Sequence, residues 1–569
     1  MRYTDTFAKE LVEKMTLDQK VGAVLTLGFA GVVPKPYIYD FIEKYHCGGL
    51  RLSCDMRTFG SYVDPKSGKT VVDVERQTGI KYKQTAPTCT AGEYAAVLAD
   101  LQMAARKRSL GIPLHFSFDQ EGGSSADFCF GGVNIFPKPM GLTATGDKEL
   151  TYKAALETAR QSRAVGFNWV HSPVLDICSE PRNPEIYTRS YSDDPAVVAD
   201  YAAATCRGLR DGGVIATGKH FPGRGHSCQD AHFGVPVIDV DRETMERREL
   251  RPYRALIAQG LLPSIMIAHS IFPAIDPDNI ATVSRKVITG LLREELGFEG
   301  VITTDSMTMG AIATRYGVAN ACAMALAAGA DLVLMKAENE LVGETVDTIK
   351  AFVADGRLPI EELNDKVYRI LALKHQYGLF EEPDAARDPA VKALAAEIAR
   401  KSILVARDAD KLLPLPTDKK ILVVEQKVKE YNDMQWHSGI LYEACMRQSR
   451  HVDYQETAYS YDDADKTAIM ARARDYDLLV ITSYFLRGKL SNREWLEGFL
   501  ADCKTPAVIV TNTPFEEISI PKNARNVVIT FATSPANVKA TAEVLFGKCK
   551  AEGKMPVKNG ISVSAEAMV

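Results

Sequence analysis

The feature that most constrains the fold of this chain is a regular alternation of apolar runs and helical patterns over its first 335 residues. Eight runs rich in β-branched residues have the length of strands, and they span residues 21–30, 48–52, 113–119, 167–176, 213–220, 264–270, 300–305 and 331–335. Amphipathic segments such as 92–110 and 148–166 lie between them. Strands of a parallel sheet are apolar throughout, because helices cover both faces of the sheet. The alternation therefore predicts an α/β fold that begins with a (β/α)8 barrel of the TIM type.

A second alternation follows and predicts a smaller three-layer α/β sandwich. Its strand-like runs are residues 420–426, 451–457, 477–484, 507–513 and 526–533. The stretch between the two parts is rich in proline and charge, as linkers are. We predict a barrel domain over 1–380, a linker over 381–394 and a C-terminal sandwich domain over 395–569. No glycine-rich phosphate loop follows the first strand of the second part, so we assign no cofactor.

Charge and composition exclude several classes of partner. The formal net charge is −5 and no run of lysine and arginine stands out, so nucleic acid is not an expected partner. No run of about 18 apolar residues occurs, and the amino terminus does not resemble a signal peptide. We therefore expect no membrane partner and a cytoplasmic location. The 11 cysteines have no metal-binding spacing, so we interpret them as reduced and mostly buried thiols.

Polar residues at the ends of the predicted barrel strands form the candidate site, because barrel enzymes place their reactive groups there. They are Asp119, Asp176, Arg189, Lys219, His220, Asp230, His232, His269 and Asp305. Each has an ordinary structural explanation as well, since an acid after a strand can cap the next helix and His269 can be a satisfied core histidine. Asp305 is the strongest single candidate because it directly follows an apolar run. The convergence of all these residues on one face favours a functional site.

The stretch GKHFPGRGHSCQDAHFGVP, residues 218–236, contains a DxH pair formed by Asp230 and His232. In a turning loop such a carboxylate can contact the imidazole, fix its tautomer and raise its basicity. A metal site is the rival interpretation, because imidazoles and carboxylates bind zinc. We expect no metal, since the stretch lacks a rigid spacing such as HExxH. The glycines are expected to let the loop bend over the site.

Several motifs together resemble glycoside hydrolase family 3, and specifically its β-N-acetylglucosaminidase branch. The motifs are FDQEGG (118–123), SPVLDI (172–177), PRNPEIYTRSY (181–191), GKHFPGRGHSCQDAHFGVP (218–236) and VITGLLREELGFEGVITTDSMTMGAI (287–312). They occur in the family order and cover the whole predicted barrel. The second part is also similar to the second domain of two-domain members of this family.

The resemblance implies a retaining glycosidase in which Asp305 attacks the anomeric carbon and forms a covalent glycosyl intermediate. His232 would act first as the acid and then as the base, with Asp230 orienting it. A histidine with a free pKa of about 6.5 suits proton transfer near neutral pH. The same resemblance implies that Asp119, Arg189, Lys219 and His220 bind the hydroxyls of the terminal sugar, and that Asp176 supports them. We expect no catalytic residue from the second part of the chain.

Two departures from the family pattern concern the substrate. Members of this branch usually follow DQEGG with an arginine and, after two further residues, with another arginine. This chain has Ser124, Ser125, Ala126 and Asp127 at these positions, so a basic contact to the substrate is missing. The connection after the second run, within residues 53–93, is also far longer than usual. It contains Arg57, Arg76 and Lys81, which could rebuild that side of the pocket.

The hypothesis that follows is an exo-acting β-N-acetylhexosaminidase that releases terminal N-acetylglucosamine from small oligosaccharides. A β-glucosidase of the same fold is the nearest alternative. A β-glycoside phosphorylase would keep the first step but let phosphate intercept the intermediate. A non-catalytic sugar-binding protein is a third alternative, which the presence of Asp305, Asp230 and His232 argues against. The sequence leaves the oligomeric state open.

Overall fold

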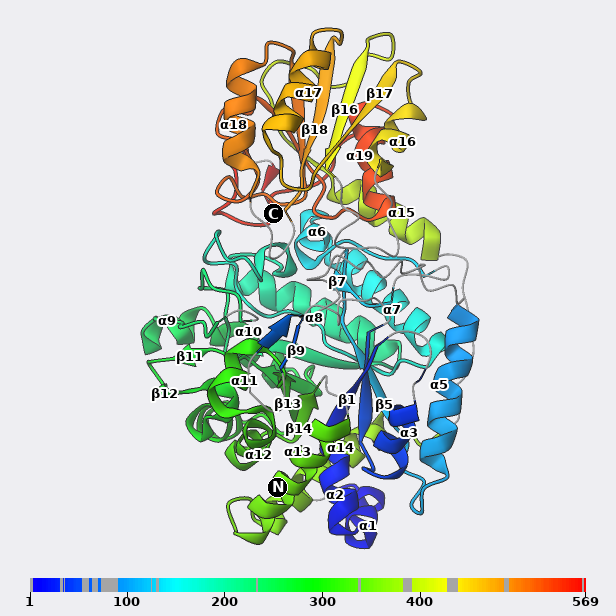
Figure 1. The fold of residues 1–569 in the computed structure, drawn as a ribbon, viewed down its shortest axis with the longest axis vertical. Helices are drawn as coiled ribbons and strands as arrows, with labels where there is room; N and C mark the ends of the chain where they lie inside the picture. Colours follow the sequence, from blue (N-terminus) through cyan, green and yellow to red (C-terminus); the bar gives the residue numbers. More distant parts are fainter. Residues whose placement is uncertain are drawn as a thin grey trace.

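The computed structural model shows a barrel covered by helices and, stacked on one end of it, a six-stranded sheet (Figure 1). It describes residues 4–30, 34, 36–53, 61–63, 70–72, 91–123, 125–128, 133–231, 234–335, 339–381, 391–426, 439–485, 491–564 and 567–568.

The barrel contains eight strands, and every neighbouring pair is parallel. They are β1 (Leu25–Ala30), β2 (Gly49–Ser53), β5 (His115–Phe118), β8 (Trp169–Val170), β9 (Ile215–Phe221), β10 (Ser264–Ile267), β13 (Val301–Ser306) and β14 (Leu332–Met335). The order around the barrel is β1-β14-β13-β10-β9-β8-β5-β2. Each strand falls on one of the eight predicted apolar runs, so the predicted (β/α)8 barrel is confirmed.

Helices surround the barrel and lie across its ends. They are α1 (Thr6–Lys14), α2 (Leu17–Ala23), α3 (Pro36–Glu43), α5 (Ala91–Arg106), α6 (Pro139–Ala144), α7 (Lys148–Val165), α8 (Pro195–Asp211), α9 (Arg242–Arg247), α10 (Leu250–Ala258), the π-helix η4 (Lys286–Glu295), α11 (Gly310–Tyr316), α12 (Val318–Ala328), α13 (Asn339–Ala354) and α14 (Ile360–Gln376). The predicted helices at 92–110 and 148–166 are α5 and α7. Local signals set the ends of α7, because the Asp147 side chain accepts amide hydrogen bonds at its start and Gly166 ends it with φ 108°. Among the described residues, no helix is both long and apolar enough to cross a bilayer.

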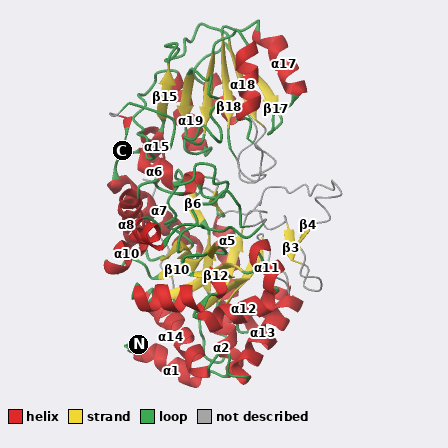
Figure 2. Ribbon diagram, turned by 90° about the vertical axis from the view of Figure 1, so that its left-hand side faces the viewer, coloured by secondary structure: helices red, strands yellow, loops and turns green. Residues whose placement is uncertain are grey.

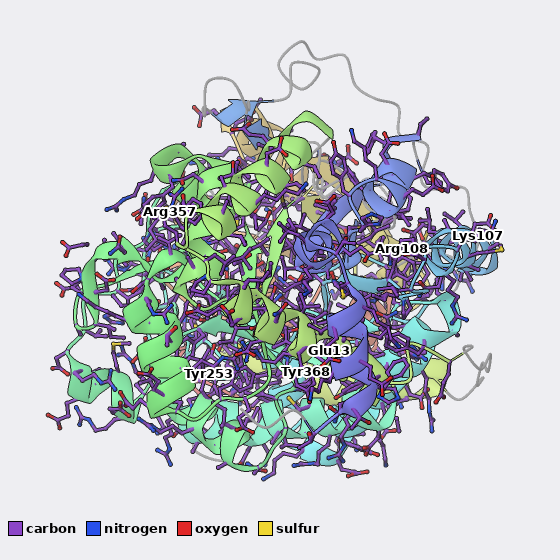
Figure 3. All side chains as sticks on the ribbon, turned by 90° about the horizontal axis from the view of Figure 1, so that it is seen from below. Glu13, Lys107, Arg108, Tyr253, Arg357 and Tyr368 are labelled. Carbon is purple, nitrogen blue, oxygen red and sulfur yellow. The ribbon has the colours of Figure 1, made fainter. Side chains whose placement is uncertain are left out.

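The amino ends of the barrel strands are closed by the first and last helices of this part. Figure 3 looks onto that end, with Glu13 of α1 and Tyr368 of α14 labelled. The backbone amide of Asp5, at the start of α1, donates to the Tyr368 hydroxyl at 2.9 Å. Lys374 of α14 is buried and donates to the carbonyls of Gly48 and Pro113. The carboxyl ends of the strands are therefore the end at which a site can open.

The six-stranded sheet forms the centre of the predicted three-layer sandwich. Its strands are β15 (Leu404–Asp408), β16 (Ile421–Gln426), β17 (Val452–Thr457), β18 (Leu478–Ser483), β19 (Ala507–Thr511) and β20 (Asn526–Ile529), in the order β15-β20-β19-β18-β16-β17. One face packs on α17 (Asp463–Ala473) and α18 (Arg493–Asp502). The other packs on α15 (Val391–Ser402), α16 (Ile440–Met446) and α19 (Pro535–Leu545). The predicted sandwich is confirmed, although β15, which is antiparallel to β20, was not predicted.

The sheet rests on the carboxyl end of the barrel. A Cβ atom added to Gly141 of α6 would lie 2.9 Å from the Cβ atom of Phe531, which follows β20. A Cβ atom on Gly123 would lie 3.6 Å from that of Ala532. The carboxyl ends of both sets of strands therefore face each other.

Further contacts join the same two surfaces. The ring of Tyr187 meets that of Phe485 edge-on at 5.2 Å between centroids. The carboxylate of Asp193 accepts hydrogen bonds from the backbone amides of Lys558 and Asn559 at 2.7 and 3.0 Å. The domain boundaries at residues 380 and 395 stay a prediction.

Within the long connection of residues 53–93, the structure describes a small antiparallel hairpin of β3 (Ser61–Val63) and β4 (Thr70–Val72). It lies at the side of the barrel in Figure 2, where β3 contacts α11. Arg57, Arg76 and Lys81 lie outside the described residues.

Candidate functional site

Four charged side chains meet at the carboxyl ends of β5 and β9. Lys219 of β9 places its Nζ 2.8 Å from Oδ1 of Asp119 and 2.6 Å from Oε1 of Glu121. Arg189, in the 3-10 turn η2 (Tyr187–Arg189), forms two hydrogen bonds of 2.8 Å to the Glu121 carboxylate. Lys219 and Glu121 are each 2% exposed, whereas Asp119 is 28% exposed. Asp119 is therefore the member of this group that is open to a ligand.

Both carboxylates of this group are held in the ionised form. Burial opposes ionisation of Glu121, but Arg189 and Lys219 outweigh it and lower its pKa to about 2. Burial also opposes ionisation of Asp119, yet Lys219 and Arg51 hold its pKa well below the usual range. Nη1 of Arg189 also donates to the Glu185 carbonyl at 3.1 Å. The site thus presents Asp119 as a hydrogen-bond acceptor, with Arg189 behind Glu121.

His220 and Asp176 form a buried pair beside this group. Oδ2 of Asp176 lies 2.6 Å from Nδ1 of His220 and accepts the backbone amide of the same residue at 3.2 Å. Burial raises the pKa of Asp176 to about 6 and holds that of His220 well below its usual value. At neutral pH the histidine is therefore neutral and donates Nδ1–H to the carboxylate, which leaves Nε2 as an acceptor. Asp176 thus holds the imidazole of His220 in place, and its expected part in sugar binding stays a prediction.

Asp305 stands on β13, close to its carboxyl end, as predicted. Its side chain is 16% exposed; Oδ1 accepts the Ser306 amide at 2.7 Å, and Oδ2 lies 3.5 Å from Nη2 of Arg224. His269 is fully buried, with Nε2 2.9 Å from the Ser306 carbonyl and Nδ1 2.7 Å from the Thr282 hydroxyl. His269 is thus a satisfied core histidine that ties down the end of the strand carrying Asp305.

The first half of the loop after β9 turns at Gly223, whose φ is 131°, and it is firmly packed at Gly225. A Cβ atom on Gly225 would lie 1.6 Å from the carbonyl oxygen of Ile177. The Asn183 side chain donates to the carbonyls of Arg224 and Gly225, and the Arg224 amide donates to Asp176. Gly225 therefore serves close packing here, not bending.

The loop then returns to the residues that follow β13. Asp230 is buried, and the Ala231 carbonyl accepts the amide of Ala311 at 3.3 Å. Asp230 is thus brought to the mouth that also holds Asp305. His232 lies outside the described residues, so its contact with Asp230 stays a prediction. Among the residues that are described, no group of three or more His, Cys, Asp or Glu side chains is arranged to hold a metal ion.

Sequence reasoning missed several titratable neighbours of the site, namely Arg51, Glu121, Asp127, His171 and Glu185. Glu121 lies in the motif FDQEGG. His171 directly follows β8, and its Nδ1 lies 3.7 Å from Oδ1 of Asp119. Arg51 had a usable signal, because a charged residue within an apolar strand needs a partner. Glu185 had none, since its contact with Arg224 at 2.8 Å depends on how two loops meet.

The eight cysteines that the structure describes agree with the expected free thiols. Five are buried, Cys228 is exposed, and no disulfide joins any of them.

The fold and the site together define a barrel enzyme with ionised carboxylates at the carboxyl ends of its strands. The sequence pattern of the glycosyl hydrolase family 3 N-terminal domain matches residues 70–373. The chain therefore belongs to glycoside hydrolase family 3, as the motifs suggested.

Known relatives extend over both parts of the chain. Beta-hexosaminidase A of Pseudoalteromonas piscicida is 26% identical over 598 residues, which cover 95% of this chain and 99% of that protein. A beta-N-acetylglucosaminidase/beta-glucosidase of Cellulomonas fimi is 28% identical over 83% of this chain and 87% of its own length. The solved structure of a family 3 beta-N-acetylglucosaminidase from Paenibacillus sp. str. FPU-7 superposes with a TM-score of 0.84 at 30% identity, covering 96% of this chain and all of that one.

Proposed function

We propose that this protein is a retaining, exo-acting β-N-acetylhexosaminidase that releases terminal N-acetylglucosamine. The observation that carries the proposal is the partly exposed carboxylate of Asp305 at the carboxyl end of β13, in the same mouth as Asp119, Lys219 and His220. The activities named for the relatives from P. piscicida and Paenibacillus support the choice of sugar.

In the first step Asp305 attacks the anomeric carbon and forms a glycosyl ester while the bond to the leaving oxygen breaks. Nη2 of Arg224, 3.5 Å from Oδ2, places a positive charge beside this carboxylate. His232 gives a proton to the departing oxygen. In the second step His232 takes a proton from water, which attacks the same carbon and releases Asp305. Asp230 orients the imidazole throughout.

The terminal sugar would lie over Asp119, Lys219 and His220. Asp119 offers ionised acceptor oxygens, and Nε2 of His220 offers a neutral one, so both suit donation from sugar hydroxyls. Arg189 would act mainly through Glu121, since its guanidinium is already bonded to that carboxylate.

A panel of 4-nitrophenyl β-glycosides of N-acetylglucosamine, glucose, galactose and xylose tests the proposal, with and without phosphate. The N-acetylglucosaminide should be cleaved with the highest kcat/KM, and the product should be the free sugar. Preference for the glucoside would identify a β-glucosidase instead. Failure to cleave any of the four would favour a sugar-binding protein.

One observation favours phosphorolysis as a second candidate. The Arg224 side chain is 2% exposed, and within the described part of the chain its Nε and Nη1 atoms have no hydrogen-bond partner. A buried cation with free donors beside the nucleophile could attract an acceptor anion. A neutral or protonated His232 would not repel phosphate, whereas a carboxylate in that role would. Detection of a sugar 1-phosphate in phosphate buffer would support this candidate, and its absence would end it.

A further inference from the structure

Arg51 is a buried arginine within a barrel strand, and two carboxylates share it. It stands on β2 with a side chain that is 3% exposed. Its Nη2 lies 2.6 Å from Oδ2 of Asp119 and 2.7 Å from Oδ2 of Asp127. A guanidinium this deeply buried is stable only when it is fully paired. Asp119 and Asp127 therefore both stabilise the buried charge of Arg51.

Asp127 holds more than the guanidinium. It follows the short hairpin of β6 (Gln120–Gly122) and β7 (Ser125–Ala126), which folds it back onto the end of β5. Its Oδ2 accepts the backbone amide of Asp119 at 2.7 Å, and its own amide donates to the Asp119 carbonyl at 2.8 Å. Asp127, which is 1% exposed, thus fixes both the backbone of Asp119 and the cation that pairs with its side chain.

The Asp119 carboxylate consequently has one cation on each oxygen. Oδ1 meets Lys219 at 2.8 Å and Oδ2 meets Arg51 at 2.6 Å. Two such contacts from different strands restrict rotation of the carboxylate, while 28% of the side chain stays exposed.

We propose that Arg51 and Asp127 are positioning residues that set the orientation and charge of Asp119 for recognition of the terminal sugar. This inference rests on the proposed function in one respect, namely that Asp119 binds the substrate. It also gives a role to the departure at position 127, because the aspartate found there pairs with the cation that β2 supplies.

The charged groups around Asp119 make the positioning role testable through the pH dependence of kcat/KM. Lys219, Arg51 and His171 are on the cationic or titratable side, and Glu121 and Asp127 are the neighbouring carboxylates. The cations hold the pKa of Asp119 low, so removal of Arg51 should raise it. The acid limb of kcat/KM should then move to higher pH, because Asp119 would become protonated earlier as the pH falls.

The test is a double-mutant cycle of Arg51→Met with Asp119→Asn, measured on the aryl glycoside that the wild type cleaves best. Arg51→Met should lower kcat/KM at least about tenfold, and Arg51→Lys should recover part of the loss. In the Asp119→Asn background the same change should cost less than about threefold, because coupled residues are not additive. Asp127→Asn should resemble Arg51→Met. Arg357→Met, which breaks an exposed pair with Asp355, is the matched control and should leave kcat/KM and its pH dependence unchanged.

Full additivity in the cycle, or an acid limb that does not move in Arg51→Met, would overturn the inference. If Arg51→Met does not fold, Arg51→Lys and Asp127→Asn each take its place in the cycle with Asp119→Asn. A crystal structure of the Arg51 variant provides a readout that needs no activity: an Asp119 carboxylate in an unchanged orientation would refute the positioning role. Absence of any glycosidase activity in the wild type would instead refute the proposed function.

Discussion

Cations and carboxylates alternate across the mouth of the barrel, and each residue depends on its neighbours for its charge. Arg189, Glu121, Lys219, Asp119 and Arg51 form one continuous series of ion pairs. The cations of this series hold the pKa values of Glu121 and Asp119 below their usual range, in a place where a lone charge would be costly. These two carboxylates are therefore acceptors for hydroxyl groups, not proton donors.

Asp305→Asn tests the assignment of the nucleophile. The amide cannot form a stable glycosyl ester, so turnover should fall on the order of 10³-fold or more while the fold is kept. Asp355→Asn, at an exposed position, is the control. A fluorosugar that retains the 2-acetamido group and forms a long-lived ester should label Asp305 in the wild type. Labelling of another residue, or an active variant free of deamidation, would contradict the assignment.

Glu121→Gln tests the electrostatic role of Glu121 through the pH dependence of stability. Its pKa is lowered from a usual value of 4.5 to about 2, so its contribution is present above pH 4.5 and is lost as the pH falls toward 2. At pH 7 the variant should be less stable by on the order of 3 kcal/mol, because it leaves Arg189 and Lys219 underpaired. The gap in Tm between wild type and variant should narrow from pH 5 to pH 3. A constant gap would contradict this role; the exposed Glu13→Gln serves as control.

The position of a residue along its own strand could be read from the sequence, but its partners could not. Asp119, Lys219 and Asp305 were found because each stands where an apolar run ends. The pairing of Arg51 with Asp119 spans 68 positions and depends on which strands are neighbours in the closed barrel. Spacing along the chain does not reveal which strands are neighbours or how they are aligned, so it cannot predict this ion pair.

At the scale of elements, the buried strands were predictable because burial on both faces makes their runs apolar throughout. β15 was not predicted because it is an edge strand without a continuous apolar run. Leu404 is buried, and the four residues that follow it are only partly buried. The loop after β9 was located correctly, but the close packing of Gly225 was not foreseen. Close packing of Gly225 against Ile177 leaves no trace in the local sequence, since it involves a segment nearly fifty residues away.

His232→Ala tests whether this loop carries an acid/base pair. Loss of the acid should damage cleavage of a disaccharide severely and that of an activated aryl glycoside much less, because nitrophenolate leaves without a proton. Asp230→Ala should show a milder form of the same pattern. Azide should accelerate the His232→Ala protein on an activated substrate, with a glycosyl azide of retained configuration as the product.

A neighbouring histidine supplies the control for the loop. His226 contacts Ser179 at 3.2 Å, and His226→Ala should show no dependence on the leaving group. Equal losses of the His232→Ala protein on all substrates, together with inactivation of the wild type by chelators, would indicate a metal site instead.

At the scale of the whole molecule, we expect the barrel to supply all catalytic groups. Replacement of acidic residues in 395–569 one at a time should leave kcat/KM per folded molecule within about threefold of the wild type. Glu425 needs a separate measurement of stability, because it is buried and accepts the amides of Leu441 and Tyr442. If replacement of one acidic residue in this part lowered kcat/KM as much as Asp305→Asn does, the expectation that the barrel supplies all catalytic groups would be refuted.

The approach of Ala532 to Gly123, and of Phe531 to Gly141, has a consequence for recombination between relatives. Two glycines in the barrel are matched to two side chains that follow β20, and Gly123 lies two residues from Glu121. In a chimera of this barrel with a foreign sheet, a side chain larger than that of Ala532 would be expected to press on the hairpin that carries Glu121. We therefore expect the two parts of the chain to be exchanged or redesigned best together, and a cut within the predicted linker of residues 381–394 not to yield interchangeable modules.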